Sequence, residues 1–257
     1  MKLSTCLNQF FGQYLPHIKG SSEKTIHAYR DTYRLFLPFA ADYYHIKVTS
    51  LRIKHLTVEM IIAFLNHLED KRKNTARTRN LRLVSIKSLA KMIRFMYPQH
   101  RRLAQQILSI PQKRMQKKLI GYLYPEEIMD VFKNVDLKKN EGFRDYCLLH
   151  LLFDSGARAT EIATLNLDYF DAHNQTLAIL CKGNCFRQIE LWPKTCELIT
   201  MYIQKYRTPP KPLYRHRLFI NQRGQALTRS GIHRLCQKYL RRVLPPKRLQ
   251  YINAAHS

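Results

Sequence analysis

The sequence predicts a mainly α-helical protein with one small β-hairpin, divided into a helical N-terminal domain and a mixed α+β C-terminal domain. Apolar residues recur at helical spacing through residues 1–97. Residues 98–121 are basic, contain prolines and show no periodicity. An alternating apolar pattern over 176–191 surrounds a turn. The expected division is therefore a domain over 1–97, a basic linker over 98–121 and a domain over 122–257.

Four amphipathic helices are expected in the N-terminal domain. The first ends at Gly20, after which Ser21 or Ser22 caps the second. Thr57 caps the third, and the fourth begins near Thr75. The apolar positions expected to face inward on the last two are Ile61, Ile62, Leu65 and Leu68, then Leu81, Val84, Leu89, Met92, Ile93 and Met96. Such helices with short connections are typical of a small bundle.

The C-terminal domain combines helices with a hairpin. A helix is expected to open at Tyr124-Pro125, because proline suits the first helical position and acidic residues follow it. Strands over 176–181 and 186–191 are joined by a turn around Lys182-Gly183-Asn184. The remaining expected elements are helices over 144–153, 157–165, 195–206 and 228–242, and a short strand over 218–220.

The composition favours a polyanionic partner. The formal net charge is +26, and residues 1–118 hold 23 Lys and Arg against 6 Asp and Glu. Nucleic acid is the first candidate partner, and an anionic membrane surface is the second. The membrane is less favoured, because no single amphipathic segment holds both the basic and the apolar residues.

The cysteines and the N-terminus indicate a cytoplasmic protein. The six cysteines include no CxxC pair, so we expect reduced thiols and no metal site. The N-terminus does not resemble a signal peptide, and no apolar run is long enough to span a bilayer, so no membrane partner is expected.

The segment from Asp154 to Ile162 is the most informative part of the chain. Asp154-Ser155-Gly156 predicts a tight turn that delivers Arg158 to the start of a helix. A guanidinium there can bind a phosphate through two parallel donors, and Glu161, one turn on, can orient it. The simpler alternative is a structural ion pair between Arg158 and Glu161.

Two further basic features point to DNA. Lys182, on the hairpin turn, can donate a proton to a leaving oxygen, unless it is only a solvated charge. No acidic residue occurs between Lys71 and Arg94, so the cations there are expected to contact backbone phosphates rather than form an ordinary solvated face. The expected DNA-binding residues of this stretch are Lys71, Arg72, Lys73, Arg77, Arg79, Arg82, Lys87 and Lys91.

These motifs, in this order, resemble the tyrosine recombinase (phage integrase) family. The resemblance in the second half rests on Gly156-Ala157-Arg158, Glu161, Leu165, Asp168, Lys182-Gly183, Arg187, Ile189, Leu191 and Pro193. In the first half it rests on Ser22-Glu23-Lys24-Thr25, Tyr29, residues 75–80 and Leu83. It implies a helical core-binding (SAM-like) domain followed by an α+β catalytic domain, with the two domains clamping duplex DNA.

The resemblance also implies a chemistry. In the family a tyrosine hydroxyl attacks a DNA phosphate and forms a 3′-phosphotyrosyl link that a second strand later reverses. Arginines, a lysine and histidines stabilise the transition state, and neither a metal nor a nucleotide cofactor is needed. The implied catalytic residues here are Arg158, Lys182 and His256, with Arg187 contacting DNA. The implied partners are duplex DNA and other recombinase protomers in a synaptic tetramer.

The C-terminal end departs from the family pattern. His256 matches the first residue of the family's His-x-x-Arg box, whose arginine and the later nucleophilic tyrosine would lie beyond Ser257. Tyr239 and Tyr251 precede that box. We therefore expect a truncated catalytic domain that exposes apolar surface and binds DNA without cleaving it.

Two alternatives remain open. One is a non-catalytic DNA-binding protein, a degenerate or truncated recombinase that occupies the recombination sites of a mobile element. The other is a nucleic-acid-coating protein selected only for charge, for which Arg158→Lys would not matter.

Overall fold

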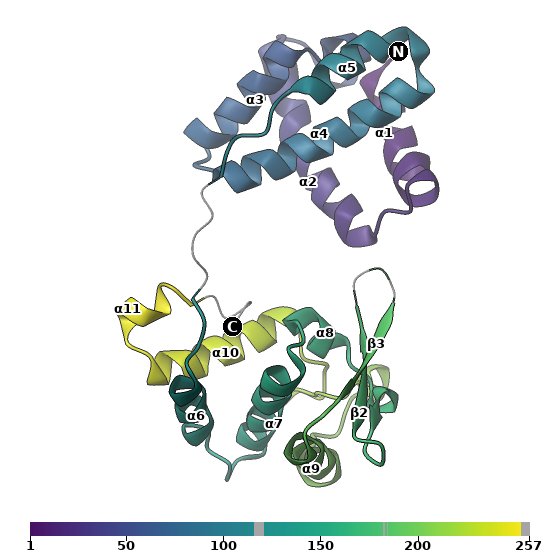
Figure 1. Ribbon diagram of the computed structural model, residues 1–257. Helices are drawn as coiled ribbons and strands as arrows, with labels where there is room; N and C mark the ends of the chain where they lie inside the picture. Colours follow the sequence, from purple (N-terminus) through teal and green to yellow (C-terminus); the bar gives the residue numbers. More distant parts are fainter. Residues whose placement is uncertain (116–120, 182, 184, 253–257) are drawn as a thin grey trace. The chain divides into compact units, whose positions relative to one another are not determined.

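A computed structural model describes residues 1–257 apart from 116–120, 182, 184 and 253–257. The chain divides into two compact units, Met1–Lys117 and Lys118–Ser257 (Figure 1). Each unit has a hydrophobic core of its own. Among the described helices, none is both long and apolar enough to cross a membrane.

The first unit is helical, as predicted. The side chains of Ser22, Thr57 and Thr75 accept backbone amide hydrogen bonds at the starts of three helices. This confirms the predicted caps at Ser22 and Thr57 and the predicted helix start near Thr75. Its elements are α1 (Leu3–Gln9), η1 (Phe10–Ile18), α2 (Glu23–Tyr43), η2 (Val48–Ser50), η3 (Ile53–His55), α3 (Val58–Asp70), α4 (Ala76–Met96), η4 (Pro98–His100) and α5 (Arg101–Ser109).

The inward face of α4 agrees with the prediction in part, since Leu89, Met92 and Ile93 are buried as expected. Leu81 and Val84 are exposed, and so is Ile62 of α3. Apolar residues occur all around α4, so its sequence offers more than one apolar face. The face that enters the core runs through Leu83, Ile86, Ala90 and Ile93, whose spacing of three and four residues follows the helical repeat.

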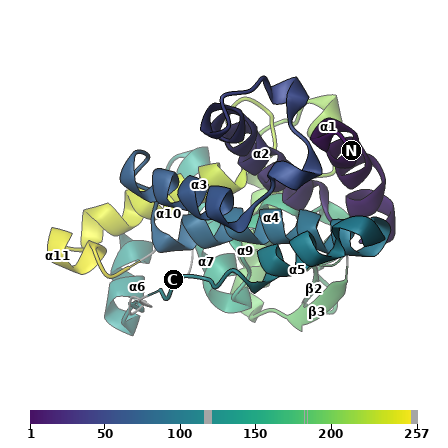
Figure 2. The same cartoon turned by 90° about the horizontal axis from the view of Figure 1, so that it is seen from above.

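The predicted linker over 98–121 is wrong in its first part, where α5 forms. This helix contacts α4 and buries Ala104 and Ile107 in the first core (Figures 1 and 2). Its apolar residues do recur at helical spacing, but the pattern covers only nine residues. Beyond the helix, the side chain of Asn80 exchanges hydrogen bonds of 2.8 and 3.0 Å with the backbone of Lys113. The first unit therefore reaches at least Lys113.

The second unit packs helices against a small antiparallel sheet in the order β1-β2-β3. Its elements are α6 (Pro125–Lys133), α7 (Asn140–Ser155), α8 (Ala159–Thr164), η5 (Leu167–Tyr169), β1 (Phe170–Asp171), β2 (Thr176–Leu180), β3 (Phe186–Glu190), α9 (Pro193–Met201), η6 (Tyr202–Tyr206), η7 (Pro212–Tyr214), α10 (Arg229–Val243) and α11 (Pro246–Leu249). The predicted hairpin is confirmed. The two-residue strand β1 is too short to show alternation, and the expected strand over 218–220 forms only an isolated bridge between Ile220 and Ala226.

The hairpin register places Arg187 on the inner face of the sheet. Leu177 and Ile179 are buried, and their partners across the ladder are Ile189 and Arg187. Directly opposed residues project to the same face, so Arg187 shares the face of these buried side chains. Because β2 contacts α8, this face leads toward Arg158.

A buried polar network joins α7 to α10. Asp145 accepts a 2.6 Å hydrogen bond from Arg144 Nη2 and a 3.0 Å hydrogen bond from the Tyr239 hydroxyl. Asp145 and Tyr239 are both almost fully buried. The hydroxyl of Tyr239 therefore satisfies a carboxylate oxygen that has little access to water.

Tyr239→Phe is expected to lower the free energy of unfolding by about 1–2 kcal/mol, because a buried carboxylate loses a donor. Urea denaturation followed by fluorescence of Trp192, the only tryptophan in the chain, reports on the second unit. The matched control is Tyr206→Phe, which keeps the ring that stacks on Phe143 at 4.0 Å. Equal effects of the two variants would show that the Tyr239 hydroxyl contributes nothing specific.

Candidate nucleic-acid interface

The turn between α7 and α8 positions Arg158. Helix α7 ends at Ser155, and the φ of +56° at the following Gly156 lies in the left-handed region that glycine adopts without strain. The chain then reverses, and Arg158 occupies the N-cap position of α8. The backbone amide of Arg158 donates a 2.9 Å hydrogen bond to Glu161 Oε2, so the carboxylate fixes the start of the helix.

Glu161 holds two guanidiniums. Its Oε1 accepts a 2.9 Å hydrogen bond from Arg158 Nη1, and its Oε2 accepts a 3.2 Å hydrogen bond from Arg187 Nη2. The Glu161 side chain is 5% exposed, whereas those of Arg158 and Arg187 are 71% and 37% exposed. One buried carboxylate thus supports two cations that retain unused donors, a combination suited to an anionic ligand.

The two arginines favour the ionised form of Glu161. Burial acts to raise the pKa of this carboxyl. The hydrogen bonds from Arg158 and the positive charges of both arginines outweigh burial, so the pKa lies below its ordinary value. Near neutral pH the three side chains therefore carry a net positive charge.

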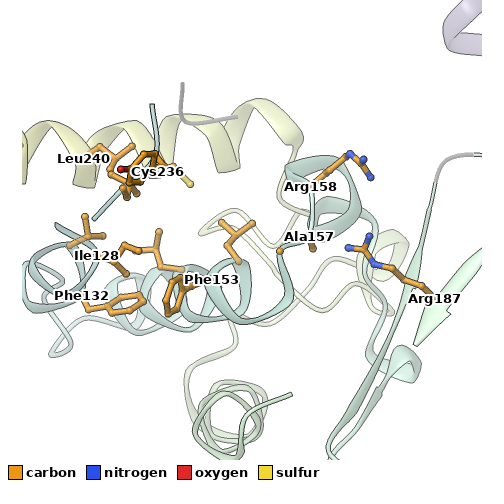
Figure 3. A pocket seen from close by; sticks show the side chains of 14 residues that line it. Ile128, Phe132, Phe153, Ala157, Arg158, Arg187, Cys236 and Leu240 are labelled. Atoms are coloured by element: carbon orange, nitrogen blue, oxygen red, sulfur yellow. The ribbon is translucent and has the colours of Figure 1, made fainter. Parts of the chain in front are cut away.

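An apolar pocket of about 540 Å³ lies beside the two arginines. Figure 3 shows Arg158 and Arg187 at one end and Ile128, Phe132 and Leu240 at the other. Its walls come mainly from α6, α7 and α10. Within the described residues, Arg187 Nε is buried and has no hydrogen-bond partner. The end of the pocket that holds the two arginines can thus present guanidinium donors to a phosphate, while the other walls offer apolar contact.

Two predicted catalytic residues, Lys182 and His256, lie outside the described residues. The structure does bring together Arg158, predicted as catalytic, and Arg187, predicted only as a DNA contact. Sequence reasoning missed the ion pair between Arg187 and Glu161. The residues are 26 positions apart, and only the strand register reveals which way Arg187 projects.

The predicted DNA-binding cations of the first unit differ in their exposure to solvent. Lys71, Arg72, Lys73, Arg77 and Lys91 are exposed. Arg82 and Lys87 are partly buried and engaged, because Arg82 donates to Thr32 Oγ1 at 3.2 Å and Lys87 to the Leu108 carbonyl at 2.7 Å. Burial, followed by the charge of Lys91, lowers the pKa of Lys87.

Arg79 departs from the predicted phosphate contact. Its side chain is 11% exposed, and its Nε lies 3.2 Å from Glu69 Oε2. Glu69 also pairs with Lys113 at 2.9 Å, so Arg79 belongs to an interior ion pair that joins α3 to α4. A guanidinium in this position presents little surface to a duplex.

Two family profiles match the chain. The profile described as "Phage integrase family" matches residues 122–247, and the profile described as "Phage integrase, N-terminal SAM-like domain" matches residues 7–94. The chain is 29% identical over 238 residues to a protein named integrase/recombinase y4rC of Sinorhizobium fredii, which covers 92% of this chain and 70% of the relative. It is 27% identical over 266 residues to the tyrosine recombinase XerD of Staphylococcus epidermidis, which covers 97% of this chain and 85% of the relative.

Solved structures share the fold. The XerH recombinase, in a post-cleavage complex with a palindromic difH substrate, matches with a TM-score of 0.68 at 18% identity, over 99% of this chain and 74% of that chain. The lambda integrase dimer bound to a COC′ core site, residues 75–356, matches with a TM-score of 0.64 at 14% identity, over 94% and 81% of the two chains. The lambda integrase tetramer bound to a Holliday junction gives 0.64 at 12% identity, over 94% and 63%.

Proposed function

The chain belongs to the phage integrase family of tyrosine recombinases, and on that premise we propose that it binds duplex DNA at the recombination sites of a mobile element. The observation that carries this proposal is the pair of guanidiniums, Arg158 and Arg187, held by one buried carboxylate at one end of a pocket. Each guanidinium presents parallel N–H donors whose spacing matches the oxygens of a DNA backbone phosphate.

Each site residue has a proposed role in the family chemistry, which cleaves and rejoins strands through a 3′-phosphotyrosine. Arg158 binds the reacting phosphate and stabilises the charge that develops on it. Arg187 supports the same phosphate, Lys182 donates a proton to the leaving oxygen, and His256 assists proton transfer. Glu161 does not touch the DNA but positions both arginines.

In this proposal the first unit contacts the phosphate backbone of the DNA. The exposed cations Lys71, Arg72, Lys73, Arg77 and Lys91 neutralise phosphates and release counterions, so affinity falls steeply with salt. Further protomers bind the paired site, as in the DNA-bound dimer and tetramer of lambda integrase.

The 257-residue chain is proposed to bind without cleaving. Two tyrosines of the second unit are unsuited to nucleophilic attack because their hydroxyls lie in the core. The Tyr239 hydroxyl donates to Asp145, and the Tyr202 hydroxyl accepts from the Ile220 amide. Burial raises the pKa of Tyr202 to about 12, which further disfavours its phenolate.

Selection from a pool of duplexes with randomised cores tests the proposal, because the target sequence is the unknown. We expect successive rounds to enrich one sequence, which the protein then binds at least about 1,000-fold more tightly than unrelated duplex. A nicked version of that sequence is expected to give no adduct that survives denaturation. An adduct with a phosphotyrosine would contradict binding without cleavage, and a pool with no enrichment would favour a coating protein selected for charge.

A further inference from the structure

We propose that Cys181 and Cys185 are a redox-active dithiol, a modification site that low-molecular-weight disulfides such as glutathione disulfide convert into a cross-strand disulfide. The two residues flank the β2–β3 turn, and both carry thiols in the structure. The effect of this modification on DNA rests on the proposed function, whereas formation of the disulfide does not.

The strand register places the two residues directly opposite each other. Leu180 pairs with Phe186 at the end of the ladder, and the next step outward brings Cys181 to Cys185. The Cys181 amide donates a 2.8 Å hydrogen bond to the Cys185 carbonyl, so the ladder continues through this pair. Opposed residues in an antiparallel ladder project to the same face, with Cα atoms about 5.5 Å apart in a hydrogen-bonded pair. That separation lies within the usual range for a disulfide, about 4.4–6.8 Å.

The other four cysteines are less suited to oxidation. Burial raises the pKa of Cys6 to about 12 and that of Cys236 to about 11. Burial also raises the pKa of Cys147 and of Cys196. Since the thiolate is the attacking species, these four thiols react slowly. Cys185 is exposed and Cys181 is half-buried, so a small disulfide can reach the pair.

The dithiol lies close to the proposed phosphate site. Cys185 directly precedes β3 and lies two residues before Arg187, so in the extended chain their side chains share the face that leads to Glu161 and Arg158. A disulfide would join the two positions that flank residues 182–184 in the sequence. Disulfides bring Cβ atoms to about 3.8 Å, closer than hydrogen-bonded strand pairs hold them, so the bond should draw the ends of the two strands together.

The chemistry balances as a two-step thiol–disulfide exchange. The thiolate of Cys185 attacks one sulfur of glutathione disulfide, which forms a mixed disulfide and releases one glutathione thiolate. The thiolate of Cys181 then attacks the Cys185 sulfur and releases the second glutathione. The protein loses two electrons and two protons, and glutathione disulfide gains them as two glutathione molecules.

Mass spectrometry of the full chain after incubation with glutathione disulfide tests the modification. We expect a mass loss of about 2 Da, the two hydrogens of the oxidised dithiol. Trypsin cleaves after Arg158, Lys182 and Arg187, so the disulfide should join the peptide 159–182 to the peptide 183–187. Cys185→Ser should block this cross-link, and Cys181→Ser should instead stop at a mixed disulfide with glutathione. A cross-link through other cysteines, or stable mixed disulfides in the unsubstituted protein, would overturn the proposal.

Binding of the selected duplex by the reduced and oxidised proteins tests the consequence. We expect oxidation to weaken binding about fivefold or more, as expected for one lost charge-assisted phosphate contact, and a reductant to restore it. Lys182→Ala should weaken binding by the reduced protein and have no further effect after oxidation. If the disulfide forms but affinity is unchanged, the regulatory consequence is wrong. If the reduced protein binds no duplex, the proposed function is wrong and the dithiol assignment stands.

Discussion

Arg158→Ala is expected to weaken binding of the selected duplex about 30-fold, equivalent to about 2 kcal/mol for a charge-assisted pair of hydrogen bonds to phosphate. The Arg158 side chain is 71% exposed, while one Nη atom and the backbone amide are anchored to Glu161. The guanidinium therefore meets a phosphate in a fixed orientation. Fluorescence anisotropy with a labelled duplex measures the change in the dissociation constant. A salt concentration of about 150 mM screens the long-range attraction between the protein and DNA.

Arg158→Lys tests whether DNA binding requires the geometry of the guanidinium or only its positive charge. Lysine keeps the positive charge but cannot present two parallel donors, so binding should remain at least about tenfold weaker than that of the unsubstituted protein. Arg223→Ala, at an exposed arginine of the same unit, removes one charge and should weaken binding about twofold. If lysine restores full affinity and the Arg223 variant matches Arg158→Ala, charge alone explains binding and the phosphate site is not where we place it.

The sequence predicts those parts of the site whose residues lie close together in the chain. Gly156, Arg158 and Glu161 lie within one turn and one helix start, so local rules of capping and left-handed glycine predict their arrangement. The contact between Arg187 and Glu161 depends on strand register and on the packing of β2 against α8, which a single sequence does not determine.

The same distinction applies to the fold. The caps at Ser22, Thr57 and Thr75 are local signals, and they mark three helix starts correctly. The cationic neighbours of Arg79 predict a contact with DNA, but Glu69, on another helix, pairs with its guanidinium in the interior. Helix α5 is amphipathic but only nine residues long, and a helix this short depends on packing against α4, which the sequence alone does not show.

Glu161→Ala is expected to lower the free energy of unfolding of the second unit by about 3 kcal/mol. The variant removes a nearly buried carboxylate that supports two guanidiniums and the first turn of α8. The guanidiniums lose their shared anion and their fixed positions, so discrimination between the selected duplex and unrelated DNA should fall at least about tenfold. Trp192 fluorescence in urea measures stability, and competition anisotropy measures discrimination.

Glu161→Gln tests how much the negative charge of the Glu161 carboxylate contributes to the stability of the protein. The folded state holds the pKa of Glu161 below its ordinary value of 4.5, so the ionised carboxylate stabilises the protein fully above that value. This stabilisation is lost as the pH falls through the lowered pKa, because the proton then binds the folded state as well. The stability gap between the unsubstituted protein and Glu161→Gln should therefore be constant above pH 4.5 and shrink below it.

Glu197→Gln is the matched control, because Glu197 pairs with Lys194 at 3.1 Å while both side chains are more than 60% exposed. A surface pair of this kind contributes about 0.5 kcal/mol, and its loss should leave DNA discrimination unchanged. A Glu161→Ala protein as stable as this control, with the same discrimination, would mean that the carboxylate does not hold the arginines. The affinity lost in Arg158→Ala would then come from charge alone, since Glu161 is the partner that orients the guanidinium among the residues that the structure describes.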